Sequence, residues 1–590
     1  MMIQHKAAKI TIAHINDTHS HFEPSAIQLH LPMPTELGET LPVYASCGGF
    51  SRVSSAVKDV KKQAYVNGRD FMFVHAGDCF QGTLYFSLYK GVANAKLLNA
   101  IGVEAMALGN HELDMGNQPV ADFLDDTHFP LLAANWDLSQ EDQSKVNPLR
   151  SKNNVYAYQA ATIDKPAFGR YMLKDVDGEK IAFFGLAIEN MEGIANPDPD
   201  TSFVNVVTAA KQTIEEIHRN GINKIVILSH LGYERDLQLA QEVEGIGAII
   251  GGHTHTMQGD FSNLGYGVTD KYAHMVHGTC VVQAGCNAMS LGQLELDFNP
   301  DGTVASAGGK HEILLGRQFT LDATRTEHLE QALHDQVKAY LQSQPNVRFC
   351  VKDPEVENLL NSEYRPAVRQ LQTQHITTVA EPLRHTRIPD AKGPSQIAPL
   401  VVDSFRWQGL QMGYDVDFAI HNAGGVRSSL NPGPLTAADI AGRLLPFAIG
   451  LMVYKVKGKY IRAALEGAID NAIDNGVEGT GSGSFPYISN LRFTYRCCSA
   501  KGERVEELET YKAGCWQLIE DEAIYTSVSS GYTATGKEGY DALLNYEMEP
   551  IALNVTMAEA FEGYAASLAE LSAPQEVRVN YIPCQCPDAA

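Results

Sequence analysis

Apolar residues recur along the first half of the chain in two strand-like rhythms. In KITIAHIND, the isoleucines Ile10, Ile12 and Ile15 follow the period of a β-strand, and RDFMFVHAGD is continuously apolar from Phe71 to Val74, as a buried strand is. Helix-like segments separate such runs from one another. This alternation predicts an α/β domain built on a parallel or mixed sheet that helices cover.

The rhythm changes near the middle of the chain. The segment TRTEHLEQALHDQVKAYLQSQPN is polar, favours a helix and ends beside a proline, so it predicts a linker helix. A second α/β region follows, punctuated by the glycine-rich stretches NAGGVR, EGTGSGSFP and GYTATGKEG. We therefore expect one domain over residues 1–320, a linker helix within 321–350, a second domain over 351–582 and a tail over 583–590.

Polar side chains with metal-binding groups follow five of the apolar runs, at the point where each run stops. They are Asp17 and His19 after KITIAHIN, Asp78 after RDFMFVHAG, Asn110, His111 and Asp114 after EAMALG, His230 after NKIVILS, and His253 and His255 after GAIIGG. Ligands of α/β sheets bind outside the carboxyl ends of the strands, so five such exits from one sheet would converge on one crevice. A helix cap or a polar turn explains any one of these residues, but not all five exits together.

The residue types at these strand ends favour a particular chemistry. Seven of these residues, two Asp, four His and one Asn, offer oxygen and nitrogen donors without a thiolate, which suits Zn, Mn, Co or Fe better than a sulfur-rich structural zinc site. Seven ligands are too many for one tetrahedral ion and fit two ions that share a carboxylate. Two ions about 3.5–4 Å apart activate water and clamp a phosphoryl group. The pattern therefore predicts a di-metal hydrolase.

Other histidines do not fit this pattern. His14 lies inside the first predicted strand, and His75 precedes the loop that carries Asp78. His21, His274 and His421 lack an apolar run followed by Gly or Ser. We therefore expect none of these five histidines to bind a metal ion.

Composition narrows the classes of partner. The chain has 70 acidic against 46 basic residues, which disfavours a nucleic-acid polymer because a phosphate backbone requires a basic surface. No run approaches the roughly 18 apolar residues of a membrane span. The N-terminus lacks a signal core, so we expect a cytoplasmic protein, or a periplasmic or extracellular one if a signal was removed. The cysteines form no CxxC pair, so free thiols are favoured.

The order DTH, GDCFQGT, GNHELD, SHLG and GGHTHT resembles that of the calcineurin-like metallophosphoesterases. With the C-terminal region included, the chain resembles the 5′-nucleotidase and UDP-sugar hydrolase family from about Lys9 to Asn580. The resemblance implies a four-layer α/β/β/α metallophosphoesterase domain, a linker helix and a C-terminal α/β domain that binds the nucleoside.

The resemblance also implies two divalent metal ions that share one bridging carboxylate. The ligands it implies are Asp17, His19 and His255 for one ion, Asn110, His230 and His253 for the other, and Asp78 between them. His111 would then meet the phosphate as a transition-state stabiliser, and Asp114 would orient its ring. Glu112 is expected to be a bystander near the N-terminus of a helix.

The motif NAGGVR matches the family's glycine-rich loop ending in Arg. By that resemblance Asn422 contacts the base and Arg427 contacts the phosphate. Gly424 and Gly425 would let the backbone approach the substrate. A plain glycine-rich turn with a surface Arg is the alternative interpretation of the same letters.

Two aromatic residues match the rings that sandwich the base in this family. LLPF supplies Phe447 and SSGYTATGKEGYD supplies Tyr532. The chain has GKEG where the family usually has GGDG, so Glu538 stands where an Asp would hold the ribose hydroxyls. The further cations expected ahead of NAGGVR are left open among Arg384, Arg387, Lys392 and Arg406.

The leading expectation is hydrolysis of nucleoside 5′-monophosphates by a metal-activated water. The alternatives are UDP-sugar or dinucleotide pyrophosphate hydrolysis, 2′,3′-cyclic phosphodiester hydrolysis, and, from another class, a catalytically inactive nucleotide-binding protein. The expected partner is a small nucleotide, and we expect a monomer or a weak homodimer.

Overall fold

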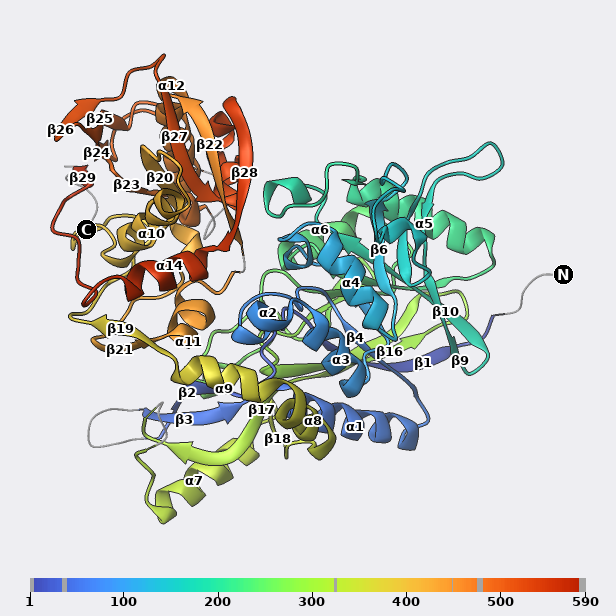
Figure 1. The fold of residues 1–590 in the computed structure, drawn as a ribbon. Helices are drawn as coiled ribbons and strands as arrows, with labels where there is room; N and C mark the ends of the chain where they lie inside the picture. Colours follow the sequence, from blue (N-terminus) through green and yellow to red (C-terminus); the bar gives the residue numbers. More distant parts are fainter. Residues whose placement is uncertain (1–4, 34–39, 323–325, 448, 475–480, 583–590) are drawn as a thin grey trace. The chain divides into compact units, whose positions relative to one another are not determined.

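A computed structural model gives the fold of this chain (Figure 1). It describes residues 5–33, 40–322, 326–447, 449–474 and 481–582. The predicted tail therefore lies outside the described residues. Contacts divide the chain into two compact units: the first comprises 1–81 and 89–365, and the second comprises 82–88 and 366–590.

A large mixed sheet runs through the first unit. In the part of the chain that the structure describes, it has twelve strands. Their spatial order is β2 (Ser25–Leu31), β3 (Leu41–Cys47), β17 (Val304–Thr320), β16 (Ser290–Phe298), β1 (Ala8–Ile15), β4 (Asp70–His75), β5 (Ala105–Ala107), β6 (Leu131–Asp137), β7 (Val155–Gln159) and β8 (Phe168–Gly169), with β11 (Ser202–Phe203) beside β6 and β18 (Val347–Phe349) beside β17. β1, β4, β5 and β6 run parallel, so their carboxyl ends lie at the same edge.

A second sheet faces the first. Its spatial order is β14 (His274–Val276), β15 (Thr279–Gln283), β13 (Ala248–Gly251), β12 (Lys224–His230), β10 (Glu179–Ala187) and β9 (Met172–Val176). β10, β12, β13 and β15 are parallel, and the register pairs Ala187 with His230 at the carboxyl edge. Apolar residues of both sheets form one buried cluster, which includes Ile12, Val74, Val226 and Ile250.

Helices cover the outer faces of both sheets. α1 (Phe50–Val66) contacts β1 and β4 and packs on α3 (Val92–Ile101), which in turn contacts α4 (Gln118–Asp126). α5 (Val206–Arg219) and α6 (Tyr233–Glu242) share an apolar cluster with the second sheet. The first unit therefore has the expected order of layers, helix, sheet, sheet and helix (Figure 1).

The helix that the sequence offers as a linker belongs to the first unit. It is α7 (Gln331–Gln342), and its residues Val337 and Leu341 are buried in an apolar cluster with β2, β3 and β17. The contacts divide the two units at Arg365. There the chain is one continuous helical stretch: α8 (Pro354–Leu359), the π-helical turn η5 (Leu360–Tyr364) and α9 (Arg365–Thr373).

The second unit is a smaller α/β body. Its main sheet has the order β23 (Pro486–Ser489), β20 (Phe418–Asn422), β27 (Ile524–Ser530), β22 (Gly450–Lys457) and β28 (Tyr546–Thr556). A second sheet has the order β26 (Cys515–Leu518), β25 (Val505–Lys512), β24 (Leu491–Arg496) and β29 (Val579–Ile582), and β19 (His375–Val379) pairs with β21 (Gly433–Thr436). The helices that complete one common core are α10 (Ile397–Gln411), α12 (Gly458–Asp474) and α14 (Met557–Ala566). α10 and α14 lie side by side (Figure 1).

A short segment from the amino-terminal half also belongs to the second unit. Residues 82–88 include most of α2 (Leu84–Tyr89). The Ser87 hydroxyl donates to the carbonyl of Ala441 at 3.4 Å, and Leu84 lies against Gly442, where an added Cβ would be 3.1 Å from its side chain. The sequence pattern did not predict this placement.

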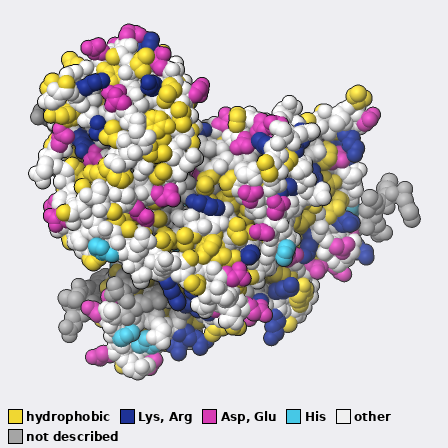
Figure 2. Space-filling model, viewed as in Figure 1, with side chains coloured by type: hydrophobic (Ala, Val, Ile, Leu, Met, Phe, Trp, Pro, Cys, Tyr) yellow, Lys and Arg dark blue, Asp and Glu magenta, His cyan; other side chains and the backbone are white. Residues whose placement is uncertain are grey.

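The structure can be compared with three expectations from composition: the distribution of surface charge, the lack of a membrane-spanning helix and the state of the cysteines. On the face that Figure 2 shows, Lys and Arg side chains lie interspersed with Asp and Glu side chains rather than in one basic stripe. Within the described ranges, no helix is long and apolar enough to cross a bilayer. Cys498 is disulfide-bonded, so the expectation of free thiols is wrong at this position.

Candidate functional site

Five strand ends carry the predicted metal ligands, and they come from two facing sheets rather than from one. β1, β4 and β5 of the first sheet are followed by the loops of Asp17, Asp78 and Asn110. β12 ends at His230, and β13 is followed by the loop of His253. The sequence reasoning assumed a single sheet, because strand period alone does not tell which sheet a strand joins.

The structure brings the seven predicted ligands together in one cluster of the first unit. His230 Nε2 lies 3.1 Å from Asp78 Oδ2, and His253 Nδ1 lies 3.0 Å from Asn110 Oδ1. The remaining three are Asp17, His19 and His255, with His255 Nε2 3.5 Å from Asp17 Oδ1 and 3.0 Å from His19 Nε2. Donor atoms within each of the groups Asp17–His19–His255 and Asp78–His230–His253 lie within 4.8 Å of one another.

The electrostatics around His230 suit a cation. His230 is fully buried, its Nδ1 lies 2.7 Å from the carbonyl of Ala76, and among the described residues its Nε2 has no hydrogen-bond partner although it faces Asp78. Burial lowers the pKa of His230, but Asp78 and Asp17 outweigh burial and raise it to about 10. The carboxylates of Asp78 and Asp17 thus stabilise a positive charge next to them. Either a proton or a metal ion can supply that charge. The donor set fits a divalent ion.

Burial differs across the cluster. Asp17 and Asp78 are buried, and despite the burial that opposes ionisation, His230 and the other nearby histidines hold the pKa of Asp78 well below its usual range. Burial lowers the pKa of His19 to about 3, which leaves its imidazole neutral as a ligand must be. The His255 side chain is 45 % exposed and marks the side that is open to solvent.

Backbone strain is concentrated at these residues. Five of the seven predicted ligands have a left-handed backbone, namely Asp17 (φ 49°), His19 (φ 45°), Asp78 (φ 59°), His253 (φ 76°) and His255 (φ 57°). Such conformations cost on the order of 1–3 kcal/mol for a residue other than glycine and persist only where the surroundings enforce them. The surrounding structure therefore holds these loops in conformations that are unfavourable for the backbone but place the ligand side chains.

Three of the five histidines that the sequence excluded make polar contacts with other groups in the structure. His75 Nε2 lies 2.9 Å from the hydroxyl of Thr18, and its Nδ1 accepts the backbone N–H of Gly77 at 3.1 Å, so His75 ties two ligand-bearing loops together. His14 Nε2 lies 2.7 Å from the hydroxyl of Tyr272. His21 Nδ1 lies 3.0 Å from the carbonyl of His19.

His111 and Asp114 form a pair at the rim of the cluster. His111 Nδ1 lies 2.7 Å from Asp114 Oδ2, and the Gln81 side-chain amide donates to the same oxygen at 3.0 Å. Burial lowers the pKa of His111, but Asp114 and Asp78 outweigh it and raise the value to about 9. The two carboxylates therefore favour the protonated form of His111, and Asp114 fixes its ring. Gln81 was missed from the sequence, although it stands in GDCFQGT.

Glu112, which we expected to be a bystander, makes several hydrogen bonds within the cluster. Its side chain is buried, and its carboxylate accepts four backbone N–H groups from the Asp78 loop and from Gly109. Glu112 does lie in the first turn of a helix, the short 3-10 turn η1 (His111–Leu113), but the expectation that it is a bystander was wrong.

The predicted substrate residues lie in the second unit. The Asn422 amide, at the end of β20, donates to Glu538 Oε2 at 3.3 Å, and the Thr533 hydroxyl donates to Asn422 Oδ1 at 3.4 Å. The Arg427 guanidinium lies 5.5 Å from the ring centre of Phe447. Tyr532 is half-buried in α13 (Gly531–Ala534).

Two glycines of the NAGGVR loop lie very close to neighbouring residues. A Cβ on Gly425 would lie 2.1 Å from the His421 ring, and one on Gly424 would lie 3.1 Å from the Cα of Gly483. These contacts require glycine for packing, whether or not a substrate also approaches.

The structure separates the four cations that the sequence left open. Arg387 faces Glu538 together with Arg427, and it also donates to the Ser482 hydroxyl at 3.2 Å. Arg384 instead binds Asp390 at 2.8 Å and the carbonyl of Gly393. The Arg406 guanidinium lies beside the Asp417 carbonyl, and Lys392 is exposed near Asp390. Arg387 is thus the cation that joins the predicted substrate residues.

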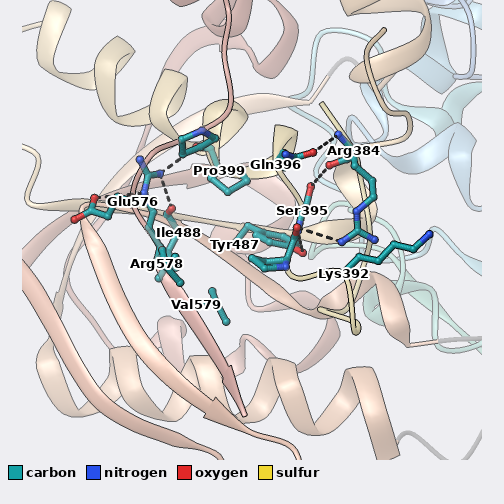
Figure 3. Close-up of a pocket in the computed structure, with 13 residues that line it drawn as sticks. Arg384, Lys392, Ser395, Gln396, Pro399, Tyr487, Ile488, Glu576, Arg578 and Val579 are labelled. Atoms are coloured by element: carbon teal, nitrogen blue, oxygen red, sulfur yellow. Dashed lines mark hydrogen bonds and ion pairs between the residues drawn. The ribbon is translucent and has the colours of Figure 1, made fainter. Parts of the chain in front are cut away.

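A cavity of about 280 Å³ in the second unit is lined by none of the predicted substrate residues (Figure 3). Arg384 and Lys392 line one end, Tyr487 lies between, and Glu576 and Arg578 line the other end. Arg578 is held by Asp403 through two contacts of 2.8 and 2.9 Å. The guanidinium groups of Arg384 and Arg578 are therefore already paired.

Two protein families match the chain. Residues 10–257 match the calcineurin-like phosphoesterases, and residues 375–545 match the 5′-nucleotidase C-terminal domain. The chain is 30% identical to a probable 5′-nucleotidase of Treponema pallidum over 91% of this chain and 87% of that protein. It is 29% identical to the NAD 5′-nucleotidase of Haemophilus influenzae over 91% and 86%. The crystal structure of a 5′-nucleotidase precursor from Thermus thermophilus matches with a TM-score of 0.70 and 28% identity over 97% of this chain and 99% of that one.

Proposed function

This chain belongs to the 5′-nucleotidase family, and from that premise we propose that it hydrolyses nucleoside 5′-monophosphates to nucleoside and phosphate. The observation that carries the proposal is the cluster of seven nitrogen and oxygen donors beside the charged His111. Two divalent ions, Zn, Mn or Co, fit this donor set, and when bound they lower the pKa of a water and neutralise phosphoryl charge.

The residues of the chain itself supply the rest of the chemistry. His111, an imidazolium at neutral pH, donates a hydrogen bond to a phosphoryl oxygen as negative charge develops there. Asp114 holds the His111 ring through Nδ1, so Nε2 is the atom that would face the substrate. Gln81 in turn holds Asp114, so the direction of this donor is fixed before the substrate arrives.

In this proposal the second unit recognises the nucleotide. Phe447 and Tyr532 stack on the base, and Asn422 contacts its edge. Glu538 accepts the ribose hydroxyls, and Arg427 with Arg387 neutralises the phosphate. The contacts of Glu538 with Asn422 and of Arg427 with Phe447 support one continuous recognition surface.

A second candidate is hydrolysis of a dinucleotide pyrophosphate. The likeness to the NAD 5′-nucleotidase of Haemophilus influenzae, at 29% identity, favours it. The same metal ligands and His111 would serve both reactions, because each breaks a phosphorus–oxygen bond. UDP-sugar and 2′,3′-cyclic phosphodiester hydrolysis need the same groups.

A substrate panel tests the proposal. The full chain is stripped with a chelator and reloaded with Mn²⁺, Zn²⁺ or Co²⁺. Phosphate release is measured with AMP, and chromatography measures the phosphate monoesters formed from NAD, UDP-glucose and 2′,3′-cyclic AMP. We expect AMP to give the highest kcat/KM and the stripped chain to be inactive. A higher kcat/KM for NAD would replace the proposal with the second candidate. Nucleotide binding without turnover under any ion would identify a catalytically inactive binding protein.

A further inference from the structure

We propose that Glu112 is the positioning residue of the metal cluster: its carboxylate acts as an internal anion that holds the Asp78 loop in shape before any metal ion binds. Glu112 Oε1 accepts the backbone N–H groups of Cys79 at 2.7 Å and of Phe80 at 3.1 Å. Glu112 Oε2 accepts those of Gly109 at 2.8 Å and of Asp78 at 3.0 Å. One side chain thus satisfies four buried backbone donors.

The shape of the Asp78 loop explains why an anion is needed there. Gly77 has φ 91° and Asp78 has φ 59°, and left-handed residues in such a loop turn successive N–H groups toward one point. A concavity of this kind binds anions. Without Glu112, the N–H groups of Asp78, Cys79 and Phe80 would point into a buried space with no acceptor, and the loop would relax.

Glu112 also joins the two loops that carry Asp78 and Asn110. The backbone N–H of His111 donates to Asp78 Oδ1 at 2.8 Å, so the residue before Glu112 holds the Asp78 carboxylate. A Cβ on Gly109 would lie 2.2 Å from Asp78 Oδ1 and 2.7 Å from Glu112 Oε2, so the loops touch there without a side chain between them. Glu112 therefore fixes the distance between Asp78 and the residues that follow Gly109.

A matched carboxylate elsewhere in the first unit provides the control. Glu141 is buried, and it accepts the backbone N–H groups of Leu149 at 3.2 Å and Arg150 at 2.7 Å, away from the predicted ligands. Glu141→Gln removes the same charge from the same kind of backbone contact. Effects that Glu112→Gln shows and Glu141→Gln does not are therefore specific to the cluster.

The first test is amide hydrogen exchange on the chelator-treated chain, which needs no activity. In the wild type, the amides of Asp78, Cys79 and Phe80 should be protected without metal. Glu112→Gln should increase their exchange by roughly 10-fold or more, and Glu141→Gln should leave them unchanged while exposing Leu149 and Arg150. Free exchange of the three amides in the metal-free wild type would overturn the proposal, even if Glu112→Gln failed to fold.

The second test is metal binding, measured as bound Mn²⁺ per chain and as the Mn²⁺ concentration that half-restores turnover. Supporting residues of this kind change metal affinity by roughly 10–100-fold, so Glu112→Gln should shift the titration by that much while the KM for AMP changes little. Glu112→Asp, which keeps the charge, should recover part of the shift. Wild-type Mn²⁺ affinity in Glu112→Gln would overturn the proposal.

This inference rests on the proposed metal site, but not on the substrate. A chain that fails to hydrolyse AMP and still shows the exchange and Mn²⁺ shifts would refute the proposed substrate and keep the role of Glu112. If the wild type hydrolyses AMP but Glu112→Gln changes neither amide exchange nor Mn²⁺ binding, the proposed substrate is kept and the role of Glu112 is refuted.

Discussion

Five of the seven predicted metal ligands in the first unit have a left-handed backbone, whereas Glu538 alone does so among the predicted substrate residues of the second unit. The first set is mostly buried, and His75 and Glu112 hold its loops. The second ranges from the buried Asn422 to the exposed Arg427. Its contacts include 3.3 Å between Asn422 and Glu538 and 5.5 Å between the Arg427 guanidinium and the ring centre of Phe447.

This difference fits the functions that we propose for the two sites. Ligands of two ions would have to be held at fixed separations, and the buried hydrogen bonds around them offset the backbone strain. Recognition of a flat base by stacking tolerates small displacements, because a ring contributes through area rather than direction. Changes in the first unit should therefore have larger effects than changes in the second.

The largest effect is expected for Asp78. Asp78→Asn removes the carboxylate charge that both halves of the cluster share, so metal binding and turnover should fall together. We expect kcat/KM for AMP to drop by at least ~10³-fold, beyond the loss typical of one electrostatic contact. The measurement is steady-state hydrolysis with metal analysis of the same sample. A variant that keeps its activity would remove Asp78 from the cluster's chemistry.

His111 should come next. His111→Ala should keep its bound metal and lose about 10²–10³-fold in kcat, because it removes one charged donor to the phosphoryl oxygens. His21 is the control: its Nδ1 lies 3.0 Å from the carbonyl of His19, and His21→Ala should change kcat little. Loss of metal from His111→Ala with catalysis otherwise intact would show that its role is misassigned.

The aromatic pair should have an intermediate effect. Stacking contributes about 1–3 kcal/mol per base, so Phe447→Ala and Tyr532→Ala should each lower kcat/KM for AMP by roughly 5- to 150-fold. Hydrolysis of p-nitrophenyl phosphate, which has no base, should change little. Equal losses on both substrates would mean that these rings do not hold the base.

Glu538 should have the smallest effect. Glu538→Gln keeps the shape but weakens the contact with Asn422 and the contacts proposed for the ribose, so kcat/KM for AMP should fall about 3- to 10-fold, in line with about 0.5–1.5 kcal/mol per hydrogen bond. The same change should matter less for 2′-deoxy-AMP. Equal losses for both nucleotides would place Glu538 away from the 2′-hydroxyl.

The sequence predicted the strand ends and their donors because strand period and local polar motifs are written in adjacent residues. It could not predict that β12 and β13 join a second sheet, since sheet membership depends on contacts distant in sequence. It also missed the role of Glu112, because a buried carboxylate that binds backbone N–H groups has no signature beyond one letter. Arg387 was one of four candidates until its hydrogen bond to Ser482 and its electrostatic influence on Glu538 were known.

The predicted linker helix is another case in which the sequence pattern allows two interpretations. Composition marked a polar helix as the linker, yet α7 buries Val337 and Leu341 and belongs to the first unit. A polar sequence with one narrow apolar stripe suits both a linker and a helix packed on a domain. Only the packing distinguishes the two.

The placement of residues 82–88 has a practical consequence for anyone who wishes to produce the halves separately. A gene fragment beginning at Pro366 would omit Leu84 and Ser87, and would leave the surface around Ala441 and Gly442 bare. Such a fragment should express poorly or aggregate. Adding a synthetic peptide that spans these residues, or fusing it ahead of Pro366 through a flexible spacer, should restore its solubility.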